Sequence, residues 1–385
     1  MECLNWPLRP KDVNGMDTLI SSGMARHQAE TTNAQAPPQG DDAELEELLK
    51  SITLTIKVVG CGGGGSNTVT RLMEEGVRGA ELIACNTDAV HLRQVHANRK
   101  ILLGRNTTRG LGAGAIPQVG EKSAREAEPE LKKAIEHSDI VFITCGLGGG
   151  TGTGAAPIVA QLAKETGALT IAFATKPFAA EGKSRQDNAD HGLNRLRAVA
   201  DTVVTIPNDK LLEMVPNLPI NAAFKIVDEL LNHSIKGLIE MVTKPGLVNL
   251  DYNDLRTIMS HAGTAVVGIG ESSEGENRAR RAVEDAITSP LLEYDVSQAS
   301  GVLLKVTGGP DMTLQEAQEV AALIGNKVAK NARIIWGASI EPEYQGKISV
   351  MIVLTGVTGE ELTGIRSDEM ATTAEGTRTG LDAVH

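Results

Sequence analysis

Aromatic residues and cysteines are both scarce in this chain of 385 residues. Phe, Tyr and Trp make up only 2% of it, so its cores must be built from Ala, Val, Ile and Leu. The four cysteines (Cys3, Cys61, Cys85 and Cys145) have no Cys-x-x-Cys spacing, and the eight histidines contain no His-x3-His pair. We therefore predict buried free thiols in a reducing compartment, and no metal site built from cysteine or histidine side chains.

Basic runs and long hydrophobic runs are absent as well. A formal charge of −12 leaves no cluster to neutralise a phosphate backbone, which argues against nucleic acid as a partner. No segment approaches the ~20 apolar residues of a membrane span, and residues 1–15 lack the apolar stretch of a signal peptide. We expect a cytoplasmic protein of two or three domains without its own membrane span.

Glycine, by contrast, is abundant, and it concentrates between Cys145 and Pro157, which read CGLGGGTGTGAAP. A short apolar run at 139–144 precedes this stretch, and a helical pattern at 155–166 follows it with Pro157 in its first turn. A strand, a glycine loop and a helix N-terminus together favour an anion, because the unpaired N–H groups and the helix dipole attract negative charge. The alternative, a flexible linker, fits these flanking patterns poorly.

A second glycine-rich turn spans 60–67 (GCGGGGSN), between an apolar run at 52–59 and a helical pattern at 68–75. Its glycines match the G-x-G-x-x-G of dinucleotide-binding units, and Asp88 follows the next predicted strand at 81–85. An acidic residue at that place can hold a ribose. Taken alone, this segment fits an NAD-dependent oxidoreductase as well as any other nucleotide-binding protein.

A third glycine loop, Arg109–Gly114, follows a strand at 100–103. Three loops that converge from the carboxyl ends of parallel strands suit a nucleotide whose whole triphosphate is enclosed. Helices and strands continue to alternate, with helices at 118–137, 155–166 and 183–200 and strands at 139–144, 168–174 and 202–206. The alternation predicts an α/β fold, doubly wound around a mostly parallel sheet.

The second half predicts a long helix and a smaller domain. Residues 219–243 carry apolar side chains on more than one face, as a central helix buried between two domains would. Beyond Ser260 a new pattern contains four strands and two helices, which predicts a second α/β domain with a mixed sheet. The strands are expected at 263–270, 301–307, 332–338 and 347–355, and the helices at 276–287 and 313–328.

Two residue pairs at helical spacing are candidate ligand contacts. Glu181 can accept hydrogen bonds from sugar hydroxyls and Arg185 can face phosphate, although a solvated pair at a helix start is an equal alternative. Phe224 and Asp228 project to one side of the central helix. A ring that stacks on a base and a carboxylate that accepts from N1–H and the 2-amino group would fit guanine; the alternative is a core Phe beside a surface Asp.

Three acidic or amide residues, Asn249, Asp251 and Asp254, cluster at a predicted helix start. The simple account is that Asp251 caps the helix while Asp254 lies near the positive end of its dipole. The functional account is that both carboxylates also point outward, where they can orient water or a cation.

Seven segments occur together in one order and resemble the successive nucleotide and catalytic loops of the FtsZ family, the prokaryotic relatives of tubulin. They are GCGGGGSN (60–67), NTD (86–88), GLGAG (110–114), GGGTGTG (148–154), PFAAEGKSR (177–185), IPNDK (206–210) and NLDYND (249–254). The resemblance covers about residues 52–357 and is greatest to the archaeal branch. It implies a GTPase that polymerises head to tail into filaments of the division ring and uses GTP/GDP with Mg²⁺, and it leaves open a further requirement for K⁺.

The resemblance also implies roles for single residues. Phosphates would be held by the glycine loops, namely by Gly62, Gly63, Gly64, Gly65, Ser66, Asn67, Gly112, Gly114, Gly149, Gly150, Thr151, Gly152 and Thr153, with Asp88 counted among the nucleotide-binding residues. Glu181 and Arg185 would face ribose and phosphate, and guanine would contact Asn208, Phe224 and Asp228. Asp251 and Asp254, with Asn249, would position the attacking water at the γ-phosphate of the neighbouring subunit.

Further copies of the chain are the first partners that the resemblance implies, followed by division-ring regulators and a membrane-tether protein or a paralogue, at mid-cell. The family's usual Ile-Pro-x-Phe-Leu type peptide is not visible in 359–385. An alternative function is a polymer scaffold that binds GTP with little hydrolysis.

The chain is thus expected to divide into five parts. A disordered leader at 1–50 holds a short acidic helix at 41–50, and a GTP-binding domain spans 51–218. The central helix follows at 219–243, then a C-terminal domain at 244–357 and a disordered tail at 358–385.

Overall fold

The computed structural model describes residues 54–210, 220–244, 246–248, 250–260, 262–273, 275–292 and 296–357. The predicted leader with its acidic helix, the predicted tail, and Asn249 lie outside these ranges. The described strands form one ten-stranded sheet in the order β3-β2-β1-β4-β5-β6-β7-β10-β8-β9.

The first six strands of this sheet are all parallel. They are β1 (Ile56–Cys61), β2 (Ala80–Asn86), β3 (Arg99–Leu102), β4 (Ile140–Gly146), β5 (Leu169–Lys176) and β6 (Thr202–Pro207). In the register of the three central strands, Cys61 pairs with both Cys85 and Cys145, and all three thiols are buried. The carboxyl ends of β2, β1 and β4 therefore lie level at one edge of the sheet, where parallel α/β sheets bind ligands.

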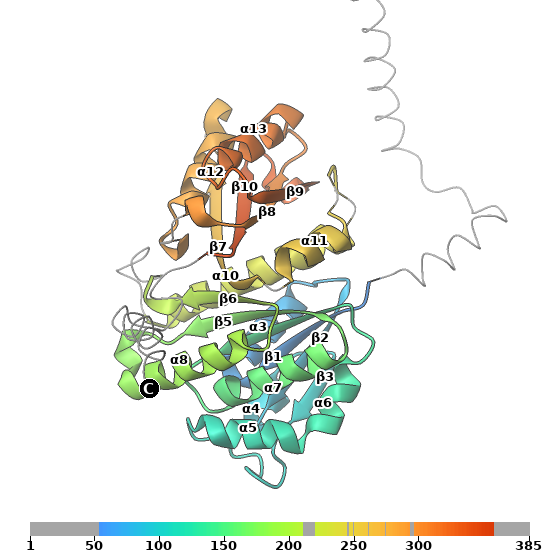
Figure 1. Ribbon diagram of the computed structural model, residues 1–385, viewed down its shortest axis with the longest axis vertical. Coiled ribbons are helices and arrows are strands. Elements are labelled where there is room, and N and C mark those ends of the chain that lie inside the picture. The colour runs from blue at the N-terminus through green and yellow to red at the C-terminus, as the bar shows by residue number, and fades with distance from the viewer. Residues whose placement is uncertain are drawn as a thin grey trace, which may run out of the picture. The chain divides into compact units, whose positions relative to one another are not determined.

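Helices cover both faces of the parallel strands. Figure 1 looks onto α5 (Pro117–Glu126), α6 (Glu128–Ile135), α7 (Thr151–Glu165) and α8 (Lys183–Arg197), whose apolar residues form a core with Val59 and its face of the sheet. Val58, on the opposite face, packs in a second core with α3 (Gly62–Glu74), α4 (Ala89–Gln94) and α10 (Ile220–Thr243). The predicted doubly wound α/β fold is confirmed.

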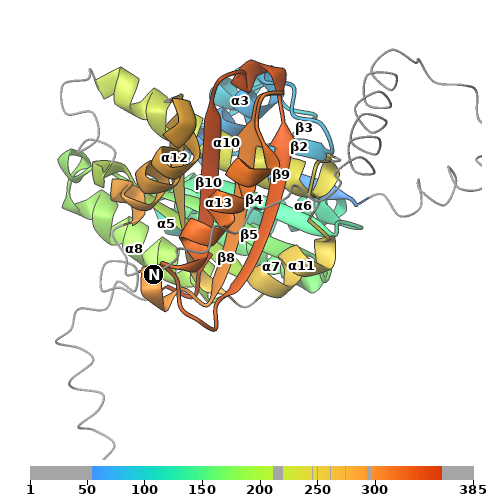
Figure 2. The same cartoon turned by 90° about the horizontal axis from the view of Figure 1, so that it is seen from above.

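The remaining strands form a mixed arrangement, as predicted. β10 (Ile348–Thr355) is antiparallel to both β7 (Gly263–Ser272) and β8 (Gly301–Gly308), and β8 is parallel to β9 (Arg333–Ile340). One face is covered by α12 (Arg278–Ile287) and α13 (Leu314–Gly325), as Figure 2 shows from above. β7 also pairs in parallel with β6, which joins both halves of the sheet.

The long helix α10 packs against both halves, as the apolar residues on more than one face of the sequence predict. Its Leu231 and Ile235 share one core with Val58 of β1 and Val353 of β10. Gly237 lies so close to β10 that a Cβ there would be 2.8 Å from Cε of Met351. The helix is thus held by side chains from both groups of strands.

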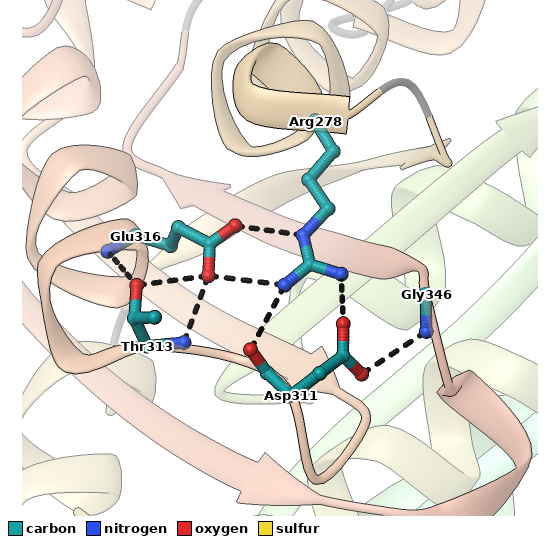
Figure 3. A network of polar contacts seen from close by, with 5 residues as sticks. All are labelled: Arg278, Asp311, Thr313, Glu316 and Gly346. Carbon is teal, nitrogen blue, oxygen red and sulfur yellow. Dashed lines mark hydrogen bonds and ion pairs between the residues drawn. The ribbon is translucent and has the colours of Figure 1, made fainter.

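A polar network ties α12, α13 and the β9–β10 connection together (Figure 3). The buried guanidinium of Arg278 donates from Nε and Nη2 to both carboxylate oxygens of Glu316, at 2.7 and 3.1 Å, and from Nη1 to Asp311. Glu316 closes a capping box with Thr313 at the start of α13, and Asp311 accepts from the backbone N–H of Gly346 at 3.0 Å. Two carboxylates therefore compensate one buried cation.

Some helix boundaries differ from the predicted ones. α3 begins at Gly62 instead of residue 68 and α7 at Thr151 instead of 155, so that Pro157 lies inside α7 and not in its first turn. Glycine has a low helix propensity, but only glycine fits at these positions. A Cβ on Gly65 or on Gly154 would lie 2.1 Å from a backbone oxygen of a neighbouring element. The predicted helix 118–137 is two helices, because Pro129 starts a new first turn.

Candidate functional site

A cavity of about 400 Å³ opens at the carboxyl edge of the parallel strands. Its walls come from the first turn of α3, the β4–α7 loop, the segments after β5 and β6, and one side of α10. Twelve of the predicted site residues line it: Gly63, Gly64, Asn67, Gly149, Gly150, Thr151, Gly152, Glu181, Arg185, Asn208, Phe224 and Asp228. Segments far apart in sequence thus meet at one place that can hold a small molecule.

Two helix N-termini border this cavity, and both lack protein caps. Neither Cys61 before α3 nor Gly150 before α7 makes a side-chain cap hydrogen bond, and neither helix has an acidic residue in its first turn. The first N–H groups of both helices and the positive ends of both dipoles are thus left for a ligand. The two helix starts suit the phosphates of one anion.

The glycines at the two helix starts differ in how much free space lies beside their Cα atoms. A Cβ on Gly63 or on Gly149 would have no heavy atom within 4 Å, so empty space lies directly against their backbone. A Cβ on Gly65 or on Gly152 would instead lie 2.1 or 2.5 Å from a backbone oxygen. Only the first pair leaves room that a phosphate can fill without displacing protein atoms.

Hydroxyl groups link the loops around the cavity. Oγ1 of Thr151 lies 2.6 Å from Oγ1 of Thr87, a residue that the sequence reasoning missed although it belongs to the quoted NTD segment. Oγ1 of Thr153 accepts from the backbone N–H of Gly148 at 2.9 Å, so that side chain braces the glycine loop and does not line the cavity. Thr151 thus lines the cavity while its hydroxyl bonds to Thr87, and Thr153 shapes the loop.

Glu181 and Arg185 line the cavity and also pair with each other. Nη1 of Arg185 donates to Oε2 of Glu181 at 2.6 Å, and the other carboxylate oxygen accepts from the N–H of Phe178 at 3.0 Å. The sequence left two interpretations of these residues open, an ion pair at a helix start and a wall of the ligand site. In the structure they form the ion pair and also line the cavity.

The wall formed by α10 offers an aromatic face and acceptors. Phe224 meets Phe178 edge to face with ring centroids 5.0 Å apart and stays 40% exposed. Burial raises the pKa of Asp228 to about 6. Oδ1 of Asn208 is buried, and no described group donates to it. An exposed ring beside two acceptors fits a base that carries N–H donors, as guanine does.

The other predicted nucleotide-binding residues lie outside the cavity lining. Asp88 caps α4, where its carboxylate accepts from the N–H groups of Val90 and His91 at 2.9 and 3.0 Å. The remaining ones are Gly62, Gly65, Ser66, Gly112, Gly114 and Thr153. Residues that line the cavity without having been predicted as contacts are Cys145, Gly146, Leu147, Thr175, Pro177, Val227 and Leu231.

The predicted catalytic carboxylates lie elsewhere. Asp251 caps α11 (Tyr252–Met259) by accepting from the N–H of Asn253 at 3.2 Å, and both Asp251 and Asp254 are exposed. The hydroxyl of Tyr252 donates to the carbonyl oxygen of Asp139, which directly precedes β4. The start of α11 is therefore at the amino edge of the parallel strands, opposite to the cavity.

The described residues contain no group of three or more His, Cys, Asp or Glu side chains that could hold a metal ion. None of their helices has the length and apolarity to cross a bilayer.

Comparison with known families gives two matches. The model described as "Tubulin/FtsZ family, GTPase domain" matches residues 55–216, and "FtsZ family, C-terminal domain" matches residues 263–358. The first match contains six of the seven motif segments, and the second begins after the seventh, which ends at residue 254. An NAD-dependent oxidoreductase, which residues 52–88 alone left open, is not supported by these findings.

Individual relatives agree with the family matches. The chain is 53% identical to "Cell division protein FtsZ 1" of Archaeoglobus fulgidus over 91% of this chain and 95% of the relative. It is 51% identical to "Cell division protein FtsZ" of Haloferax mediterranei over 89% and 90% of the two chains. Among solved structures, "FtsZ dimer, empty (M. jannaschii)" is 51% identical with a TM-score of 0.79, covering 83% of this chain and 93% of that chain.

Proposed function

This chain belongs to the tubulin/FtsZ family of GTPases, and we propose that a second copy of the chain completes its hydrolytic site. The family membership makes it a GTP-binding protein and a GTPase. What the membership leaves open is which residues bind the nucleotide and where the water-positioning carboxylates come from.

The nucleotide is proposed to lie along the cavity, with its phosphates on the first turns of α3 and α7. The open backbone at Gly63 and Gly149 supports this placement. The ribose then lies beside Glu181 and Arg185. The guanine stacks on Phe224 and donates to Asp228 and Asn208, whose buried acceptor otherwise has no described donor.

The observation that carries the proposal is the separation between the cavity and the exposed carboxylates. Tyr252 places the start of α11 at Asp139, the amino end of β4, while Cys145 near the carboxyl end of β4 lines the cavity. The seven residues of β4 span ~20 Å. Asp251 and Asp254 therefore cannot reach a nucleotide in their own chain.

A second copy stacked in the same orientation removes this separation. The amino edge of one copy then faces the carboxyl edge of the next, and the carboxylates of Asp251 and Asp254 approach the terminal phosphate. Positioning a water and stabilising charge are what phosphoryl transfer requires from a protein. Asn249, in the same loop, is proposed to assist, although it lies outside the described residues.

Mg²⁺ is the proposed cation, and a further requirement for K⁺ stays open. Mg²⁺ is commonly held by substrate phosphates with one or two carboxylates, and it does not need a cage of protein ligands. When bound, the cation would neutralise phosphate charge next to the carboxylates that the second copy supplies.

In the cell the chain is proposed to form head-to-tail filaments of the mid-cell division ring in the cytoplasm. The relatives named cell division protein and the solved FtsZ dimer support self-association and this role. Division-ring regulators and a membrane-tether protein, or a paralogue in that role, are the further proposed partners.

The test is GTP hydrolysis per subunit measured as phosphate release over a range of protein concentrations. We expect almost no turnover in dilute protein and a rise above a threshold concentration. Asp254→Asn and Asp251→Ser remove one carboxylate each, and serine keeps the cap on α11. Either variant, mixed into wild type, should lower the turnover of the mixture while still binding GTP.

Two other results would separate the alternatives. A rate per subunit that is constant with concentration would show a site complete in one chain and contradict the proposal. Filament formation with negligible turnover at every concentration would instead favour the GTP-binding scaffold.

A further inference from the structure

A hydrogen-bonded relay runs from the end of β2 to the cavity through His91. It begins at the buried carboxamide of Asn86, whose Oδ1 accepts from the backbone N–H groups of Thr87 and Asp88 at 2.8 and 3.3 Å. Two backbone donors on one oxygen fix which end of the amide is which. Nδ2 of Asn86 therefore points at His91, 3.2 Å from Nδ1.

The orientation of Asn86 determines the tautomer of His91. Because Nδ2 of Asn86 is a donor, Nδ1 of His91 must accept, and the ring proton lies on Nε2. Nε2 is 3.1 Å from Oδ1 of Asn67. The ring is also held in place at its backbone, since the N–H of His91 donates to the carboxylate of Asp88 at 3.0 Å.

The tautomer in turn orients Asn67. Nε2–H of His91 donates to Oδ1 of Asn67, so this oxygen faces the ring and the Nδ2 hydrogens remain for an acceptor elsewhere. Asn67 lies on α3 and lines the cavity together with Gly63 and Gly64 of the same helix start. Its amide donors thus join the backbone donors that face the phosphates.

We propose that His91, as the Nε2–H tautomer, is a positioning residue that keeps the amide donors of Asn67 directed to a nucleotide phosphate. A freely rotating Asn67 would present its oxygen to the phosphate in part of its orientations, where two acceptors repel. The inference rests on the proposed placement of the phosphates at α3. It adds a residue that does not line the cavity itself.

The test uses two uncharged substitutions at position 91. Gln places an amide donor near the position of Nε2 and an acceptor beside Asn86, whereas Leu places neither. Binding of a slowly hydrolysed GTP analogue is measured by calorimetry at a protein concentration below the assembly threshold. His91→Gln should bind within about threefold of wild type, and His91→Leu roughly three- to tenfold more weakly, the range expected for one lost hydrogen bond.

The same two substitutions are repeated on Asn67→Ala, where the difference between Gln and Leu should vanish. The ¹⁵N chemical shifts of the His91 ring should report a protonated Nε2 and an unprotonated Nδ1. Thermal unfolding of each variant checks that it is folded.

Equal affinities of folded His91→Gln and His91→Leu, or a difference that persists on Asn67→Ala, would overturn the positioning role. A ring protonated at Nδ1 would do the same. Failure of wild type to bind the analogue would count against the proposed function itself, which keeps the two conclusions separate.

Discussion

The ammonium group of Lys305 on β8 lies 2.8 Å from the carboxylate of Glu240 on α10, and both side chains are buried. Glu240 also accepts from Lys244 at 2.7 Å. Burial opposes ionisation of Glu240, but the two lysines outweigh it and hold its pKa below the ordinary value. The long central helix is thus joined to the C-terminal strands by a buried charge pair as well as by apolar packing.

Removing one partner of this pair should destabilise the fold. Lys305→Met leaves a buried carboxylate with only the more exposed Lys244, and we expect the free energy of unfolding to fall by about 3 kcal/mol. Urea unfolding measures it. Lys305→Met combined with Glu240→Leu should recover most of the loss, because no charge is then left buried; an additive further loss would contradict this explanation.

Substitutions at Gly63 and Gly65 should separate binding from folding. Gly63→Ala adds a methyl group that meets no atom of the chain, so stability should be kept, while the methyl occupies phosphate space and lowers GTP affinity at least tenfold. Gly65→Ala places its methyl 2.1 Å from the carbonyl oxygen of Thr144 and should cost about 3 kcal/mol of stability. Calorimetric binding and thermal unfolding of both variants check this. An unchanged GTP affinity in Gly63→Ala would show that the phosphates do not bind at the start of α3.

GTP affinity should fall in acid because of Asp228. Burial raises its pKa to about 6, and the proposed guanine contact needs the ionised carboxylate as acceptor. The acceptor is therefore present above about pH 6 and is lost below it, so affinity should drop by roughly tenfold per pH unit there. Asp228→Asn supplies the baseline for titration of the phosphates themselves. If the GTP affinity of wild type and that of Asp228→Asn fall in parallel with pH, Asp228 does not take part in guanine recognition.

The Arg278 network predicts an acid-sensitive C-terminal region (Figure 3). The guanidinium of Arg278 lowers the pKa of Glu316, and the N–H of Gly346 together with Arg278 lowers that of Asp311. Because folding lowers the pKa values of Glu316 and Asp311, their ionised forms stabilise the folded chain fully above the ordinary carboxyl pKa range. This stabilisation is lost as the pH falls through the lowered pKa values. Arg278→Met should lower the thermal midpoint by roughly 5 °C at pH 7 and flatten its dependence on pH below 4.5, whereas Arg278→Lys should retain part of that dependence. An unchanged pH profile in Arg278→Met would exclude this role.

The fold was largely predictable because its strongest signals are local. Apolar runs such as 139–144 end in glycine loops, and that alternation alone specifies parallel strands with helices between them. The predicted boundaries were wrong where glycine occurs in helices, at Gly62–Asn67 and Thr151–Gly154. Propensity assigns these residues to loops, and only the close approach of neighbouring backbone requires glycine inside a helix start.

The candidate site was predictable in its parts but not in its contacts. Glu181 and Arg185 could be singled out by spacing, yet their ion pair depends on rotamers that a sequence does not contain. Asp88 stays a predicted nucleotide contact, and the structure adds that its carboxylate caps α4, which the sequence did not indicate. His91 carried no signal at all, because its partners Asn86 and Asn67 come from different elements and meet only in the folded chain.

The placement of the cavity and of Asp251 at opposite edges of one sheet gives any proposed stack of copies a direction. One terminal subunit would expose an open nucleotide cavity, and the other would expose carboxylates with no phosphate to act upon. Nucleotide exchange from solution would then be fastest at the first end, and hydrolysis would be absent there. The two ends would therefore differ in chemistry before any partner distinguishes them, so growth and loss of subunits would have separate rates at each.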